Sequence, residues 1–219
     1  MEILSIRRGF LADHSSTSYE FLAVDKPLDA KTRSAVSRLS SRVRPTTRRA
    51  SFVYHVEGYD IPGGWGALMA KYYDVMYSES YDWWTLAVAF NTTSKELVSR
   101  LCKYAFHGVE DLGVDVSYRN KRVVVTIHCR LDLNYLYRDY EDWYEEDEDE
   151  SGGIVATDDS LLDLLVRIRE QLKKGDCQAL YAVWKVYGDE DDGEGPPKPR
   201  KTKDGAPVAA ELASTLAPM

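Results

Sequence analysis

The sequence predicts an α+β protein with a mainly antiparallel sheet and helices on one of its faces. Short runs rich in β-branched and aromatic residues alternate with apolar patterns of helical period. The β-α segments 21–39 and 85–101 also share the letters LAV and VSRL in matching places, with a two-residue gap. A repeated β-α unit is typical of a split-βαβ, ferredoxin-like sandwich, so we expect that fold.

The first half of the chain reads as strand, helix, strand and short helix. Residues 18–25 form an apolar-rich run that stops before Lys26-Pro27, and Asp29 can cap the helix that follows. Residues 50–58 alternate in the manner of a sheet strand, and Pro-Gly-Gly then separates them from a short helix at 65–73.

The second half adds strands and an αα-hairpin. Residues 74–82 and 83–91 are expected to be two strands joined by a tight turn, followed by a helix capped by Thr93 or Ser94. Residues 114–133 read as a β-hairpin that turns at 118–121. Two leucine-rich stripes separated by Gly175 and Asp176 then predict two packed helices.

These patterns divide the chain into four parts. We expect an α+β sandwich over 1–140, an acidic loop over 141–153, a C-terminal αα-hairpin over 154–188 docked on the sandwich, and a disordered tail over 189–219. The loop follows from eight acidic residues among the ten at 141–150. The tail follows from its acidic, then Pro- and Lys-rich composition, with few large apolar residues and at most a nascent helix near residues 209–216.

Composition limits the class of protein. The chain has 219 residues, 44% of them hydrophobic, which suits one main core. The net charge of -8 argues against a protein that coats nucleic acid over its whole surface. No signal peptide or run of eighteen apolar residues occurs, so we expect a cytoplasmic protein with no membrane contact.

No cofactor or metal site is expected. The three cysteines form no CxxC pair and read as reduced, buried thiols. The four histidines lie far apart in the sequence and at no ligand spacing. No nucleotide-binding fingerprint is present.

Several blocks of the sequence resemble those of a known family. The blocks are "DHSSTSYEF", "YDIPGGW" and a GDxxALYxxW pattern, here "GDCQALYAVW", within a likeness that spans roughly residues 10 to 187. They are similar to those of an uncharacterised family of prokaryotic cytoplasmic proteins. Val166 stands where the longer form of the last block has Leu, and relatives often have a shorter segment in place of the acidic loop. The resemblance implies one compact unit and no particular activity.

Two polar stretches could contact a ligand. Asp13 and His14 open "DHSSTS", whose acid, imidazole and hydroxyl groups suggest a hydrolase, although neighbouring residues of an extended chain point to opposite sides. The alternative is a polar turn that satisfies backbone groups. Tyr59 and Asp60 precede "IPGGW", which is either a strand-to-helix connection or an anion cradle next to the N-terminus of a helix.

Tyr and Trp are concentrated between residues 54 and 84, and the chain has 15 Tyr against 5 Phe. Rings at this density usually fill a core, but their hydroxyl and indole donors also suit a partner surface or a ligand groove. The residues that we assign to such a partner or ligand site are Asp13, His14, Tyr54, Tyr59, Asp60, Trp65, Tyr77, Trp83 and Trp84.

A basic strip is the third candidate. Seven Lys or Arg residues and no acid lie between Lys31 and Arg49. The strip is either an ordinary solvated helix face with its loop or a phosphate-binding surface, and the aromatic signature of an RNA-recognition sheet is missing. The residues expected to contact phosphate or nucleic acid are Arg38, Arg42, Arg44, Arg48 and Arg49.

We therefore predict a non-catalytic protein–protein interaction or adaptor module that binds a protein partner or a second copy of itself. The first alternative is an RNA- or DNA-binding protein that uses the basic strip. The second is an enzyme with a polar-aromatic cleft formed by Asp13, His14, Tyr59, Asp60 and Trp65.

Overall fold

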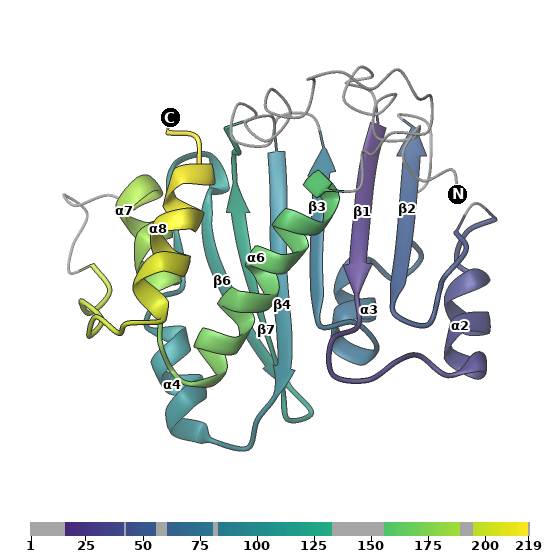
Figure 1. Cartoon of the computed structure of the whole chain (residues 1–219), viewed down its shortest axis with the longest axis horizontal. Helices are drawn as coiled ribbons and strands as arrows, with labels where there is room; N and C mark the ends of the chain where they lie inside the picture. Colours follow the sequence, from purple (N-terminus) through teal and green to yellow (C-terminus); the bar gives the residue numbers. More distant parts are fainter. Residues whose placement is uncertain are drawn as a thin grey trace.

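The computed structural model describes residues 16–41, 43–55, 61–80, 83–132, 156–188 and 195–218. In this part of the chain, seven strands form one antiparallel open sheet in the order β2-β1-β3-β4-β7-β6-β5 (Figure 1). The strands are β1 (Ser16–Leu22), β2 (Arg49–His55), β3 (Val75–Ser80), β4 (Trp83–Asn91), β5 (Phe106–His107), β6 (Gly113–Arg119) and β7 (Arg122–Cys129). The helices are α2 (Ala30–Ser37), α3 (Trp65–Lys71), α4 (Lys95–Cys102), α6 (Ala156–Lys173), α7 (Gln178–Tyr187) and α8 (Gly205–Thr215).

Local signals in the sequence predicted the element boundaries well. Asp29 caps α2 by accepting a hydrogen bond from the Thr32 N–H at 2.7 Å, and Ser94 caps α4 in the same way through Leu97 N–H at 3.1 Å. Between β6 and β7, Asn120 and Lys121 both have positive φ, as a two-residue hairpin turn requires. The α+β class and the antiparallel sheet are confirmed.

The ferredoxin-like order is wrong. In a split βαβ unit, two parallel strands joined by a helix flank a third strand, but β1 and β2 pair directly and antiparallel. Since β2 and β3 both pair antiparallel with β1, they run parallel to each other and flank it. The split βαβ unit is therefore formed by β2, α3 and β3 with β1 between the two strands, and not by β1, α2 and β2 as predicted. The matching letters of the two β-α segments do not produce matching packing, because α2 and α4 bury their apolar residues on opposite faces of the sheet.

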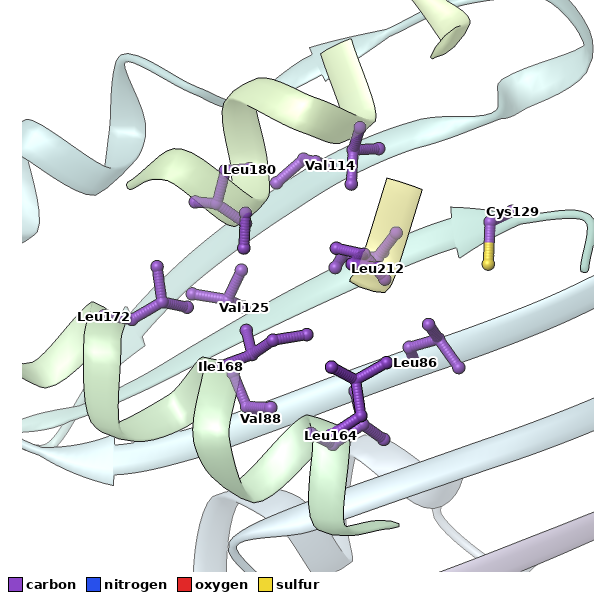
Figure 2. Close-up of a cluster of buried hydrophobic side chains, with 14 of the residues drawn as sticks. Leu86, Val88, Val114, Val125, Cys129, Leu164, Ile168, Leu172, Leu180 and Leu212 are labelled. Carbon is purple, nitrogen blue, oxygen red and sulfur yellow. The ribbon is translucent and has the colours of Figure 1, made fainter. Parts of the chain in front are cut away.

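Helices cover both faces of the sheet rather than one. The larger core lies under α4, α6, α7 and α8, where Leu86 and Val88 of β4 meet Ile168 of α6 (Figure 2). A smaller core on the other face joins α2 and α3 to β1 and β2. The central strands supply alternate residues to the two cores: Tyr77 of β3 points into the first and Met76 into the second.

Helix α8 corrects the prediction of a disordered tail. It packs against α7 and α6, and its Val208 and Leu212 are buried in the larger core. Backbone hydrogen bonds fix its end, from Asp132 N to Thr215 O and from Ala217 N to Arg130 O, both at 2.9 Å. The expected nascent helix near residues 209–216 is thus an ordered helix. Composition understated it because α8 consists mainly of small residues, and only Val208, Leu212 and the following Leu216 bring large side chains into the core.

Replacing Leu212 by Ala tests the role of α8. We expect Leu212→Ala to lower the free energy of unfolding by about 2–5 kcal/mol, because it removes a fully buried side chain from a packed core. Denaturation in guanidinium chloride measures the change. Ala210→Ser, at an exposed position of the same helix, should change stability by less than about 0.5 kcal/mol. Equal stabilities of Leu212→Ala and wild type would mean that α8 is not part of the core.

Candidate functional site

The structure tests only some of the predicted site residues. Asp13, His14, Tyr59, Asp60 and Arg42 lie outside the described residues, as does the acidic loop 141–153. Of the five residues proposed for a catalytic cleft, only Trp65 therefore lies in the described part of the chain.

The aromatic candidates do not form one site, because strand alternation divides them between the two faces. Tyr77 and Trp84 are 1% and 3% exposed and pack together in the larger core, with ring centroids 6.0 Å apart. Tyr54 and Trp65 pack against the smaller core on the other face. Trp83 differs from these four, since 39% of it is exposed. The default interpretation as core is thus correct for Tyr77 and Trp84.

Trp83 is held on the surface by a cation. The pairing of Trp84 with Cys129 places Trp83 across from Arg130, and the Arg130 guanidinium carbon lies 5.1 Å from the centroid of the Trp83 ring. Arg130 also forms an ion pair with Glu110 at 2.7 Å. Stacking a cation on the ring fixes the indole while leaving its other surface accessible.

Two histidines and one carboxylate lie on the same face as Trp83. His107 Nε2 is 3.4 Å from Asp115 Oδ1, and His128 Nε2 is 3.2 Å from Asp115 Oδ2. The sheet register brings them together, because Gly113 pairs with His107 on one side and with His128 on the other. No spacing in the sequence could show this, since 21 positions separate the two histidines. Within the described ranges, no group of three His, Cys, Asp or Glu residues is arranged to hold a metal ion.

We call the surface formed by Trp83, Arg130, His107, Asp115 and His128 the open face. Register and alternation put these residues on the side of the sheet that carries the smaller core. On this side α3 packs against β4 and β7 at the end of these strands where Arg122 meets Met69, whereas Trp83 and Arg130 lie at the opposite end of the same strands. Antiparallel sheets commonly leave one face to solvent or to a partner.

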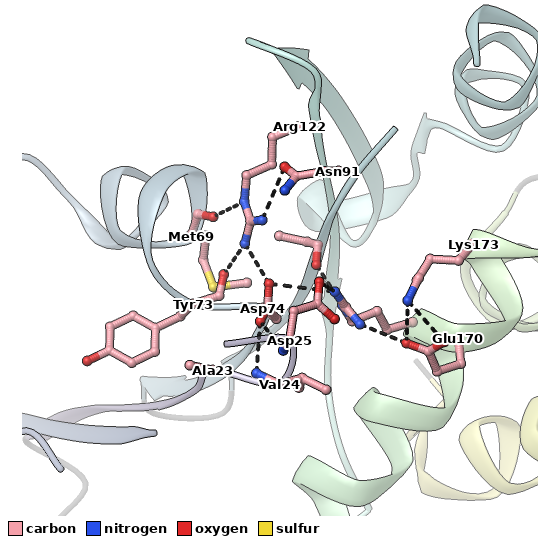
Figure 3. A network of polar contacts seen from close by, with 12 residues as sticks. Ala23, Val24, Asp25, Met69, Tyr73, Asp74, Asn91, Arg122, Glu170 and Lys173 are labelled. Carbon is pink, nitrogen blue, oxygen red and sulfur yellow. Dashed lines mark hydrogen bonds and ion pairs between the residues drawn. The ribbon is translucent and has the colours of Figure 1, made fainter. Parts of the chain in front are cut away.

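A buried ionic network occupies the end of the sheet where β1 and β4 finish and β3 and β7 start (Figure 3). Asp74 is its centre. One carboxylate oxygen accepts from the backbone N–H groups of Val24 and Asp25 at 2.8 and 2.9 Å, and the other lies 2.9 Å from Arg122 Nη2 and 3.6 Å from Arg169 Nη2. Both carboxylate oxygens of Asp74 are therefore bound by groups of the protein itself.

The two arginines reach Asp74 from opposite faces. Arg122 also donates to the carbonyl oxygens of Met69, at 2.7 Å, and of Tyr73, on the α3 side. Arg169, which is fully buried on α6, donates to the Ala89 carbonyl at 2.7 Å and to Asp25. Since every partner is a structural group of the fold, we interpret the network as a tie between the two layers and not as a reaction centre.

The network also sets the acidity of Asp25. Burial alone would raise the pKa of this carboxyl, but the hydrogen bond from Arg169 and the positive charges of Arg169, Lys173 and Arg122 outweigh burial and hold the pKa below its usual range. The ionised form of Asp25 is therefore favoured by folding.

One arginine of the basic strip makes hydrogen bonds within the fold. Arg48 Nη1 donates to the carbonyl oxygens of Ala23 and Val24, at 2.9 and 2.8 Å, and so positions the loop after β1. Arg38, Arg44 and Arg49 are exposed. Arg48 acts here as a structural residue, which weakens the strip as a phosphate-binding surface.

Two cysteines match the expectation of buried thiols and one does not. Cys129 and Cys177 are buried, and Cys102 is exposed. Burial raises the pKa of Cys129, and it raises the pKa of Cys177 to about 12. Both buried thiols therefore stay protonated and unreactive at neutral pH.

Comparisons with protein-family models, with curated proteins and with solved structures found no match to this chain. The resemblance to a prokaryotic family thus stays an expectation from the sequence. None of the described helices is long and apolar enough to cross a lipid bilayer.

Replacing Asp25 by Asn tests the network through pH. Because folding lowers the pKa of Asp25, its contribution to stability is complete above pH of about 4 and is lost as the pH falls through the folded-state pKa. Asp25→Asn should therefore be less stable than wild type at pH 7, and the difference should shrink as the pH falls from about 5 to about 2. Urea denaturation at a series of pH values measures it. Asp163→Asn, at an exposed position of α6, is the control and should stay within about 0.5 kcal/mol of wild type. A deficit of Asp25→Asn that does not vary with pH would contradict the network.

Proposed function

We propose that the protein is a non-catalytic interaction module that docks a protein partner, or a second copy of itself, on the open face. The observation that carries this proposal is the exposed Trp83 ring with Arg130 stacked on it. A cytoplasmic location, expected from the sequence, is part of the proposal.

The residue types of the open face support docking. Trp and Arg are the side chains most often found to dominate the energy of protein interfaces. Trp83 is 39% exposed, and its partner Arg130 keeps the indole in one orientation. An aromatic ring that is already oriented loses little side-chain entropy when a partner covers it.

Charged groups surround the aromatic ring. Glu110 supplies a carboxylate beside Arg130, and Asp115 supplies one between the imidazoles of His107 and His128. Charges of both signs around a central aromatic residue suit the rim of an interface, where they select the partner and set the association rate.

The other two predicted functions have less support in the described part of the chain. The basic strip is less suited to nucleic-acid binding because Arg48 is engaged in hydrogen bonds within the fold. The enzyme hypothesis depends on residues outside the described ranges, with the exception of Trp65.

Trp83→Ala tests the proposal, with Tyr118→Ala as a matched control. Tyr118 is 40% exposed, close to the value for Trp83, but alternation along β6 places it with Val114 and Val116 toward the opposite side of the sheet. A partner is first identified by affinity capture with the wild-type protein, and self-association by sedimentation. Its affinity for both variants is then measured by titration calorimetry.

We expect Trp83→Ala to cost about 2 kcal/mol or more of binding free energy, roughly a thirtyfold loss of affinity, because it removes the central ring of the interface. Tyr118→Ala should keep wild-type affinity. Equal affinities of the two variants, or a loss confined to Tyr118→Ala, would exclude the open face as the docking surface.

A further inference from the structure

A basic groove lies at the opposite end of the sheet from Trp83. Trp83 begins β4, and α4 follows the end of β4, so the two lie at different ends of that strand. The groove has a volume of about 600 Å³. Three stretches that are distant in sequence line it: the end of α4 and the turn after it, the α6–α7 turn, and the segment 197–204 that leads into α8.

Five cationic side chains face this groove against two carboxylates. The cations are Arg100, Lys103, Lys174, Arg200 and Lys203, and the acids are Asp176 and Asp204. In the described part of the chain, none of the five cations forms an ion pair with a carboxylate. By contrast, Lys173, one residue before Lys174, is paired with Glu170 at 2.9 Å. The chain as a whole has a net charge of -8, so these unpaired cations form a local region of positive charge on an acidic protein.

One of the two acids is already engaged. Asp176 accepts hydrogen bonds from the Gln178 backbone N–H and side-chain amide, both at 3.0 Å, and from the Thr202 hydroxyl. Gln178 is itself buried. These hydrogen bonds fix Asp176 in the wall of the groove and leave its negative charge in place.

The walls are joined by further contacts. The Tyr104 hydroxyl donates to the Pro197 carbonyl at 2.8 Å, and Gln178 donates to the Thr202 hydroxyl at 3.0 Å. These bonds attach the segment 197–204 to α4 and to α7. The backbone of the three stretches is therefore held together before any ligand arrives, so that binding has to order only the cationic side chains.

Tyr104 and Cys177 also line the groove and carry no negative charge. Burial raises the pKa of Tyr104 and of Cys177 to about 12, so both are neutral at physiological pH. Lys103 and Lys174 follow the ends of α4 and α6, where cations also favour the helix dipole. Arg200 and Lys203 follow no helix end, and the dipole gives no reason for them to face the groove.

We propose that this groove binds a small molecule that carries several phosphate groups. Lys and Arg at fixed positions are the usual ligands of phosphate oxygens. The volume lies in the range of small-molecule sites. The cations surround a hollow from three directions, whereas a nucleic-acid strand is followed by a stripe of charge. Five cations against two carboxylates leave an excess of three positive charges, which matches an oligophosphate better than a single carboxylate.

The test is calorimetric titration of the full-length protein with inorganic tripolyphosphate at 50 mM and at 200 mM salt. The groove variant is Lys103→Gln with Lys203→Gln, at two exposed positions on different walls, for which no polar contact within the described chain is lost. The matched control is Lys31→Gln with Lys71→Gln, which removes two charges from exposed positions on α2 and α3, away from the groove. Circular dichroism and thermal unfolding verify that both variants fold.

We expect wild type and control to bind tripolyphosphate equally, with affinity that falls as salt rises. The groove variant should bind about tenfold or more weakly, because it loses two of five charge-assisted contacts. No binding by wild type at low salt, equal binding by the groove variant, or a loss confined to the control would overturn the proposal. A single-stranded oligonucleotide that binds the groove more tightly than tripolyphosphate would overturn the assignment to a small molecule. The result does not depend on Trp83, so it is independent of the interaction proposed for the open face.

Discussion

The structure depends on one buried carboxylate, Asp74, held between two arginines that come from opposite sides of the sheet. Arg122 connects it to α3 and Arg169 connects it to α6. A buried acid without cations would be strongly destabilising, and so would Arg122 without the acid, whereas Arg169 also pairs with Asp25 and Glu170. The three residues are therefore satisfied only when both helical layers are docked at the same time. Hydrophobic burial supplies the driving force, and this network selects the arrangement.

The network also explains where the two candidate surfaces lie. Arg169 fixes the C-terminal half of α6, and Lys174 and the α6–α7 turn follow directly from that half. This places one wall of the basic groove. On the other face, α3 packs against β4 and β7 near Arg122, and Trp83 at the opposite end of β4 stays exposed. The open face and the basic groove thus result from the same asymmetric coverage of one sheet.

Much of the fold could be predicted because its determinants are local. The caps Asp29 and Ser94 and the turn residues Asn120 and Lys121 act through neighbours in the chain, and so the element boundaries were readable. The strand order could not be predicted in this way. It depends on which strand pairs with β1, and the sequence around residues 21–39 gives no information about that choice.

The candidate sites were less predictable for the same reason. Trp83 and Trp84 are equivalent as letters, yet alternation buries one and exposes the other, and which one depends on the face that α6 covers. His107 and His128 meet through the register of three strands, and Lys103 meets Lys203 through the docking of α8. The basic strip was visible because its charges are contiguous, while the groove is assembled from residues up to about a hundred positions apart. Long-range packing decides all of these contacts.

The free energy of unfolding of Asp74→Asn tests the central role of the network most directly. The substitution keeps the size of the side chain and removes the charge that both arginines share. We expect a loss of about 3–5 kcal/mol in guanidinium denaturation at pH 7, because the largely buried Arg122 is left without its carboxylate partner and Arg169 keeps only Asp25 and Glu170. A change below about 1 kcal/mol would contradict the account, since the two helical layers would then be held together by apolar packing alone.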